Sequence, residues 1–232
     1  MAKTVAVNSP ATNQLLAALP RAESQRLLQS MESVALAFGD VLYEPGDAIR
    51  HVFFPNDSLI SLLTVVDHHH ALEVGMVGRE GMVGLSYALG RRHSSTRALV
   101  QGAGSAMKMS ASAFRTQFRH SQTLQRQVHL HTHTLLVQIA QTAACNRFHV
   151  IEARLACWLL MTRDRIGKNE FRLTHEFLAD LLGVRRVGVT NAANALRQRR
   201  LIDYHRGEIS IVDAVGLGAV SCSCYQPMPQ LL

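Results

Sequence analysis

The chain has 232 residues, of which 47% are hydrophobic and 18% charged, with a formal net charge of +7. This length permits one large domain or two small ones, each with its own core. The basic balance favours a polyanion or an anionic membrane surface as partner. No run of about 18 apolar residues is present to span a bilayer, and the N-terminus lacks the apolar core of a signal peptide. We expect a protein of the reducing cytoplasm, because four clustered cysteines do not make a disulfide framework.

The first half of the chain changes from helical to strand-like patterning. The first ten residues read as a loose tail, and residues 13–30 have helical spacing interrupted by Pro20. From residue 34 to about residue 109, short apolar runs are separated by turn signals such as Pro45-Gly46-Asp47 and Gly102-Ala103-Gly104. Short strands at intervals of roughly ten residues predict an antiparallel sandwich or barrel.

A long helix is predicted next, over residues 111–146. Within it, apolar residues follow one another at spacings of four, seven and four, close to the seam of a coiled coil: Leu124, Val128, Leu135 and Ile139. The seam is imperfect, because His131 or Thr132 fills the slot between Val128 and Leu135. The pattern predicts that this helix pairs with its counterpart in a second copy of the chain.

Residues 174–202 read as two short helices broken at a glycine. Thr174 is the expected N-cap, and Gly183 can take the left-handed conformation that ends the first helix. The predicted apolar faces are Phe177, Leu178, Leu181 and Leu182 in the first helix, and Val184, Val189, Ala192 and Leu196 in the second. The small Ala179 permits close approach. A helical hairpin with a solvated basic face would show a similar period, but outward arginines without acids among them favour an anionic partner. We predict a helix-turn-helix whose second helix enters the DNA major groove.

Residues 201–212 alternate as a two-stranded hairpin around Arg206-Gly207, the expected wing of a winged helix. The chain therefore divides into a β-rich domain with an N-terminal helix (1–110), a connecting helix (111–150) and a winged-helix domain (151–232). The predicted fold class is α+β.

Several stretches carry a family resemblance, which runs from about Leu15 to Tyr225. Phe38 to Gly46 resembles the opening strands of a β-roll, and Arg154 to Leu160 resembles the first helix of a DNA-binding domain. The helix-turn-helix is the most specific match. Together they resemble the Crp/Fnr superfamily, that of the cAMP receptor protein and the fumarate-nitrate reductase regulator. The resemblance implies an antiparallel β-roll like that of cyclic-nucleotide-binding domains, a dimerisation helix and a winged helix-turn-helix. It implies a homodimeric transcription regulator, not an enzyme, with double-stranded DNA and RNA polymerase as partners.

The resemblance also assigns DNA contacts by position. The positions of the family's base readers are held by Arg185, Arg186, Val187, Gly188 and Asn191. Arg186 matches an arginine that reads guanine. Val187 replaces a frequent acid, and Gly188 a frequent serine or threonine. Thr174 is expected to reach a phosphate, and Arg197, Arg199 and Arg200 either do the same or form a solvated helix end. A two-fold dimer implies an inverted repeat with half-sites about 34 Å apart.

The resemblance places the effector pocket at Glu80, Gly81, Met82, Val83, Thr96 and Arg97. Relatives that bind cyclic nucleotides use a Gly-Glu pair for the ribose and an Arg-Ser or Arg-Thr pair for the phosphate. These pairs become Gly81-Met82 and Thr96-Arg97 here, so the ribose acceptor is missing. Glu80 and Arg97 lie one residue off, which reverses a side chain in a strand. We expect an effector other than cAMP or cGMP, or none.

Histidines and cysteines raise the question of a metal, and no ligand set is assigned. Asp67 to His70 is expected to cap a hairpin. His129 and His133 share a helix face, either as a metal or pH sensor across the dimer seam or, as we favour, as polar positions that set the helix register. No cysteine precedes Cys145, which argues against the iron-sulfur cluster of the family's oxygen sensors. Cys222 and Cys224 are a thiol pair or half a metal site, and free thiols are favoured.

Two other functions fit parts of the sequence. Residues 84–88 have a weak likeness to the nucleophile elbow of hydrolases, but that motif needs a parallel sheet, and this region reads as antiparallel. A ligand- or metal-sensing adaptor that acts through protein contacts, without specific DNA binding, is the second alternative. The outward arginines argue against it.

Overall fold

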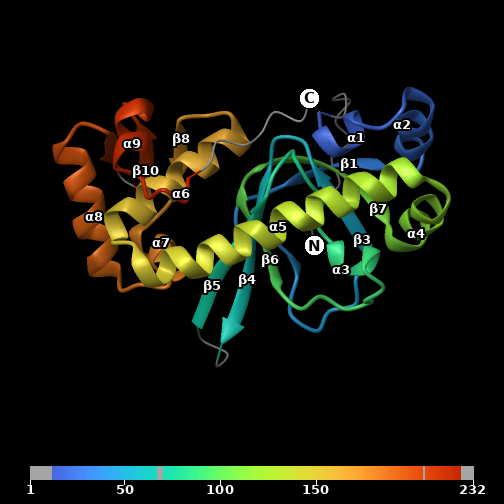
Figure 1. Ribbon diagram of the computed structural model, residues 1–232, viewed down its shortest axis with the longest axis horizontal. Coiled ribbons are helices and arrows are strands. Elements are labelled where there is room, and N and C mark those ends of the chain that lie inside the picture. Colours follow the sequence, from blue (N-terminus) through green and yellow to red (C-terminus); the bar gives the residue numbers. More distant parts are fainter. Residues whose placement is uncertain (1–11, 67–69, 206, 226–232) are drawn as a thin grey trace. The chain divides into compact units, whose positions relative to one another are not determined.

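The computed structural model describes residues 12–66, 70–205 and 207–225 (Figure 1). They form two compact units: one holds the described residues up to Thr64 and from Gly75 to Val137, and the other holds those of Val65–Val74 and from Gln138 onward. The predicted N-terminal tail, Asp67 to His69 of the predicted hairpin cap, and Arg206 lie outside the described residues. No helix among the described residues has the length and apolar character needed to cross a membrane.

The first unit begins with two short helices, α1 (Gln14–Ala17) and α2 (Arg21–Leu28). Asn13 caps α1 by accepting a hydrogen bond from the Leu16 amide at 3.2 Å. The Asn13 side-chain amide in turn donates to the carbonyls of Pro55 and Gly81, at 2.8 and 2.9 Å. This buried asparagine therefore fastens the N-terminal helices to the β-rich part of the unit. The predicted interruption at Pro20 is confirmed.

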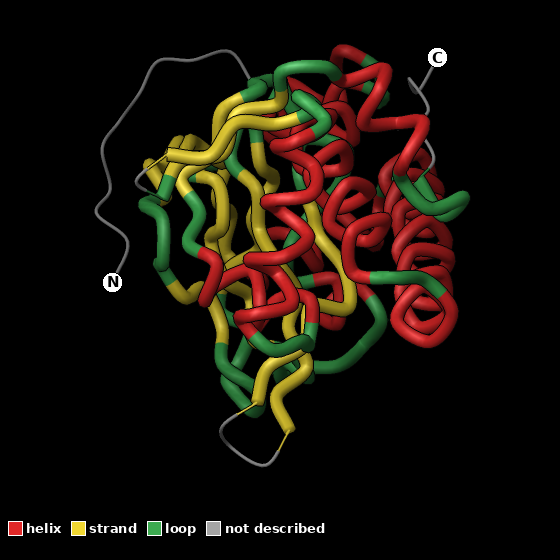
Figure 2. The backbone as a smooth tube through the Cα atoms, turned by 90° about the vertical axis from the view of Figure 1, so that its left-hand side faces the viewer, coloured by secondary structure: helices red, strands yellow, loops and turns green. Residues whose placement is uncertain are grey.

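The described strands up to residue 110 form two sheets, and strands are drawn in yellow in Figure 2. One sheet has the order β1 (Glu32–Leu36), β7 (Gly104–Ser110), β3 (His51–Pro55). The other has the order β2 (Val41–Tyr43), β6 (Arg97–Gly102), β4 (Leu59–Val66), β5 (His70–Val77). Both contain antiparallel pairs, such as β1 with β7 and β4 with β6. Val34 and Ala106 from the first sheet pack with Ile60 and Val100 from the second in one buried cluster. The predicted antiparallel β architecture is confirmed.

Helices α3 (Leu85–Ala88), α4 (Ala111–His120) and α5 (Gln122–Phe148) follow. The single helix predicted over residues 111–146 is wrong, because the chain leaves helical geometry at Ser121, with φ −117° and ψ 105°. The Ser121 hydroxyl accepts a hydrogen bond from the Leu124 amide at 2.9 Å, as an N-cap residue does. The break lets Phe114 of α4 pack in one buried cluster with Leu124 and Val128 from the first turns of α5.

Besides the end of α5, the described residues of the second unit form the helices α6 (Ile151–Ile166), α7 (His175–Leu182), α8 (Arg186–Gln198) and α9 (Ala214–Val220). A small antiparallel sheet has the order β8 (Glu170–Arg172), β10 (Glu208–Ile211), β9 (Ile202–His205). Gly207 lies between the last two strands with φ +85°, so the predicted wing hairpin is confirmed. Leu155, Leu178, Val189 and Leu196 are fully buried. These side chains pack the helix-turn-helix of α7 and α8 onto α6.

Candidate nucleic-acid interface

The turn between α7 and α8 is built by local hydrogen bonds. The Thr174 hydroxyl accepts from the Phe177 amide at 3.1 Å and so caps α7. At the other end Gly183 is left-handed, with φ 62° and ψ 42°, and the Val184 amide donates to the Ala179 carbonyl at 2.9 Å. Glycine adopts this conformation without the steric cost of a Cβ. Both predicted ends of the first helix are confirmed.

The start of α8 presents its polar side chains to solvent. Arg185, Arg186 and Asn191 are exposed, and Val187 is 62% exposed. The opposite side of the helix carries the buried Val189, Ala192, Ala193 and Leu196. The structure therefore brings the predicted base readers together on one accessible face, close to the positive end of the helix dipole.

Gly188 differs from its neighbours because it is half-buried. A Cβ atom added there would lie 2.8 Å from Cδ1 of Ile151 at the start of α6. Real Cβ atoms do not approach this closely, so a larger residue requires Ile151 to move. Because Cδ1 is the far end of a flexible side chain, a rotation of Ile151 is enough to accommodate that residue.

Three arginines of the interface have carboxylate partners that the sequence did not show. Arg186 lies 3.8 Å from Glu176, Arg197 lies 3.0 Å from Asp203, and Arg199 lies 3.2 Å from Glu152. The partners come from α7, β9 and α6, so the expectation of an uncompensated positive face is corrected. These pairs are at the surface, where such interactions contribute between about 0 and 1 kcal/mol. A phosphate can replace the carboxylates at little cost.

His175 joins three elements of the interface and was missed in the sequence. Its ring stacks on Tyr204 of the wing, with centroids 4.2 Å apart and planes at 22°, and its Nδ1 lies 3.0 Å from the Thr190 hydroxyl of α8. Burial, reinforced by the charge of Arg186, lowers the pKa of His175 from its ordinary value. The neutral imidazole therefore holds the wing and α8 in a fixed arrangement at neutral pH.

These features define a winged helix-turn-helix domain. Residues 153–220 match the Crp-like helix-turn-helix domain. The chain also resembles solved structures of the Crp/Fnr type. A CRP-family transcriptional regulator from Thermus thermophilus has a TM-score of 0.70 at 16% identity, over 83% of this chain and 98% of that one. FixK2 from Bradyrhizobium japonicum has a TM-score of 0.70 at 12% identity, over 83% and 98%.

A third structure is that of CLP, the c-di-GMP-responsive global regulator of Xanthomonas campestris, with a TM-score of 0.64 at 13% identity over 83% of this chain and 99% of that one. No curated protein sequence matches this chain significantly. The chain has the Crp/Fnr-type transcription regulator fold, with a β-rich N-terminal part like a cyclic-nucleotide-binding domain and a Crp-like helix-turn-helix.

The residues predicted to form the effector pocket have different surroundings in the first unit. Met82 and Val83 are 1% and 2% exposed and belong to the core. Arg97 holds both carboxylate oxygens of Glu44, at 3.0 and 2.9 Å. Glu80 accepts from the Gly78 amide within its own turn, and Gly81 packs against the ring of His131.

An open cavity of about 360 Å³ lies instead beside α3 and α4. Four arginines line it, Arg91, Arg92, Arg115 and Arg119, together with Tyr87, Phe114 and Phe118. No carboxylate is among the residues that line this cavity. A lining of guanidinium groups and aromatic rings suits an anionic ligand with a planar ring.

The predicted dimer seam needs a correction. Leu124 and Val128 are fully buried in the chain's own core, beside Phe54 and Phe114. They are already covered, so they are not available for a second copy, while Leu135 and Ile139 are half-buried. The exposed apolar side chains of α5 in the first unit are Leu130, Leu136 and Val137, at 45%, 60% and 48%. His129 and His133 are exposed beside them.

Proposed function

We propose that this chain is a sequence-specific DNA-binding transcription regulator that binds an inverted repeat as a homodimer, with RNA polymerase as a further partner. One observation carries the proposal: Arg185, Arg186 and Asn191 lie together on the accessible face of α8, in a domain that matches the Crp-like helix-turn-helix.

Five of the predicted DNA-contacting residues have a chemical role in this proposal. Arg186 donates two hydrogen bonds to guanine, and Asn191 pairs with adenine. The exposed Val187 contacts a thymine methyl in place of the cytosine that an acid would read. Thr174 and Arg197 hold phosphates, Thr174 through the amides at the start of α7 because its hydroxyl caps that helix. Phosphate contacts of this kind fix the register without reading sequence.

The test is selection from random duplex DNA at physiological salt by the purified protein. We expect enrichment of an inverted repeat with half-sites about one helical turn apart. The matched control carries Arg185→Ala, Arg186→Ala and Asn191→Ala, all at exposed positions, and should enrich no sequence. An adaptor without specific DNA binding would enrich nothing with either protein, also when cell extract supplies a missing ligand.

The second copy is proposed to pack on the exposed apolar side chains of α5. Leu130 and Val137 are seven residues apart, the repeat of a coiled coil, and Leu136 directly precedes Val137. Sedimentation should show a dimer for the natural chain and a monomer for Val137→Glu. The control Gln25→Glu, at an exposed position of α2, adds the same charge and should stay dimeric. A natural chain that sediments as a monomer on its operator contradicts the proposal.

The effector is proposed to be an anion that enters the arginine-lined cavity of the first unit. We favour this cavity over the predicted loop as the effector site, because four arginines line the cavity, whereas Arg97 of the predicted site is already paired with Glu44. Thermal shift measurements with cAMP, cGMP and c-di-GMP, each on the natural chain and on the double variant Arg115→Ala with Arg119→Ala, test it. We expect no response to cAMP or cGMP. Stabilisation by any of the three that survives Arg115→Ala with Arg119→Ala contradicts this cavity.

A further inference from the structure

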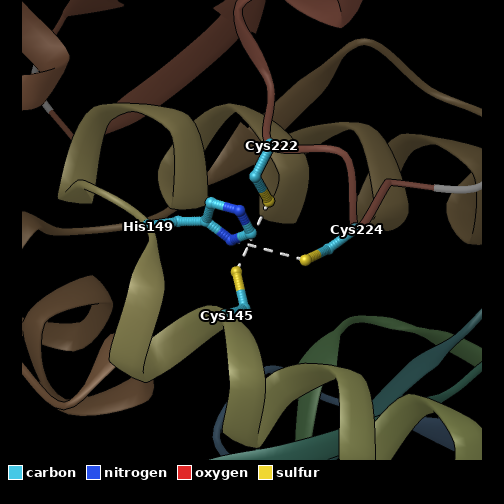
Figure 3. Close-up of side chains that lie close together, drawn as sticks. All are labelled: Cys145, His149, Cys222 and Cys224. Atoms are coloured by element: carbon cyan, nitrogen blue, oxygen red, sulfur yellow. Dashed lines mark hydrogen bonds between the residues drawn. The ribbon is translucent and has the colours of Figure 1, made fainter.

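Four side chains with soft ligand atoms meet in the second unit (Figure 3). Cys145 lies in the last turn of α5, His149 directly follows that helix, and Cys222 and Cys224 follow α9. Their three sulfur atoms and one ring nitrogen of His149 all lie within 4.8 Å of one another. In Figure 3 the four side chains point toward a common centre. Among the described residues, these four side chains form the group whose ligand atoms lie close enough together to hold a metal ion. None of them belongs to α8.

The separations fit a tetrahedral metal centre. The Cys145 and Cys222 sulfurs are 3.4 Å apart, and the Cys224 sulfur lies 3.4 Å from Nδ1 of His149. With zinc bond lengths of about 2.3 Å to sulfur and 2.0 Å to nitrogen, the edges of a tetrahedron are about 3.5–3.8 Å. A disulfide would bring two sulfurs to about 2.05 Å. Small side-chain rotations are therefore enough to close the four atoms around an ion.

The surroundings of the cluster suit an anionic centre. Three thiolates around a divalent cation leave one net negative charge. The guanidinium of Arg154 is buried and interacts electrostatically with Cys145 and Cys222, so it offsets that charge. The Gln141 side-chain amide donates to the Cys224 sulfur at 2.8 Å. Such outer contacts orient the ligands of metal centres.

The segment after α9 is held in place by contacts independent of a metal. The Cys222 amide donates to the Ala153 carbonyl at 3.3 Å, and the Tyr225 amide donates to the Cys222 carbonyl at 3.0 Å. The Tyr225 hydroxyl donates to Asp164 at 2.9 Å. These bonds fix both cysteines beside α6 and α5, so the ligands are preorganised.

We propose that Cys145, His149, Cys222 and Cys224 bind a zinc ion as a closed four-coordinate site. All four positions are filled by the protein, which is the pattern of structural rather than catalytic zinc. Binding releases the thiol protons to solvent and involves no oxidation. The ion would tie the end of α5 to the segment after α9, a connection beyond DNA recognition itself.

The test is metal analysis of the whole chain, followed by titration of the fully reduced apo-protein with Co²⁺. We expect one zinc ion per chain, and a tetrahedral cobalt spectrum with thiolate charge-transfer bands that saturates at one equivalent. Cys145→Ser and Cys224→Ser should lose the charge-transfer intensity or weaken binding by more than tenfold. Gln141→Leu should weaken it about 10–100-fold with the spectrum retained.

Two matched controls separate coordination from general effects of losing a side chain. Cys157 is buried next to the cluster but is not one of its four ligands, and Ser223 is exposed between two of them. Cys157→Ser and Ser223→Ala should both keep the spectrum and the stoichiometry. An octahedral spectrum, no binding by the reduced natural chain, or unchanged binding by Cys224→Ser overturns the proposal. A Cys145–Cys222 disulfide in a protein whose reduced form binds no cobalt would identify a redox pair instead.

Discussion

Replacing Arg186 by alanine gives the sharpest prediction about DNA recognition. In the free protein Arg186 is 70% exposed, and its partner Glu176 is 76% exposed at 3.8 Å. An exposed pair at this distance contributes little, so almost the full energy of the guanine contact should appear in the measured affinity. A bidentate arginine–guanine contact discriminates by about 1–3 kcal/mol, which is a loss of about 5–150-fold in affinity.

Fluorescence anisotropy at fixed salt, on the selected operator and on one with the contacted guanine replaced, measures this loss. The natural chain should lose affinity on the altered operator, and Arg186→Ala should bind both operators equally. Arg26→Ala, which removes an exposed charge from α2 in the first unit, is the control and should change neither affinity. An equal loss on both operators by Arg186→Ala would show a phosphate contact and refute the assigned role.

Three further predictions concern the stability of the second unit. Gly183→Ala should destabilise the second unit by about 1–2 kcal/mol, because alanine in the left-handed region carries that cost. Thermal unfolding measures this loss of stability. The control Gly218→Ala, which has open space at the Cβ position, should not destabilise the unit. Gly188→Ser should leave the melting temperature unchanged or raise it slightly, because serine has a higher helix propensity than glycine and the added Cβ meets only the flexible Cδ1 end of Ile151, at 2.8 Å. A large fall in the melting temperature that Ile151→Ala recovers would show that Ile151 cannot rotate away. The lowered pKa of His175 means that the unfolded chain binds a proton that the folded chain does not, so stability should fall as the pH drops through the ordinary value of 6.5. His175→Phe should flatten that part of the profile in urea unfolding; an unchanged profile would assign the dependence elsewhere.

The sequence predicted what short-range signals determine. Thr174 and Gly183 mark the ends of α7 because capping and left-handed geometry depend on neighbouring residues only. The periodicity of Leu124 and Val128 is real, but a period shows that a face is buried and does not show which partner covers it. Their own core covers them, whereas the predicted seam assigned them to a second copy.

The cysteine cluster could not be predicted for a different reason. Cys145 and Cys222 are 77 residues apart, so no spacing rule connects them. From the sequence, only Cys222 and Cys224 could be recognised as half of a metal site. A histidine four residues after Cys145 was the signal that could have completed the set. Likewise, Glu152 and Asp203 reach the arginines of α8 only through the packing of α6 and β9.

For the proposed DNA-binding function, the contact of His175 with Tyr204 and Thr190 is expected to affect which operators are preferred. A wing, a turn and a recognition helix held together by one imidazole have little freedom to adapt to the duplex, so they lose little conformational entropy on binding. The DNA then has to change its shape to fit the protein, and the energy needed to bend it depends on its base steps. We expect the preferred operators to differ from the rejected ones partly at base pairs that no side chain contacts. Flexible pyrimidine–purine steps at those positions would let the DNA bend so that both half-sites contact a rigid protein surface.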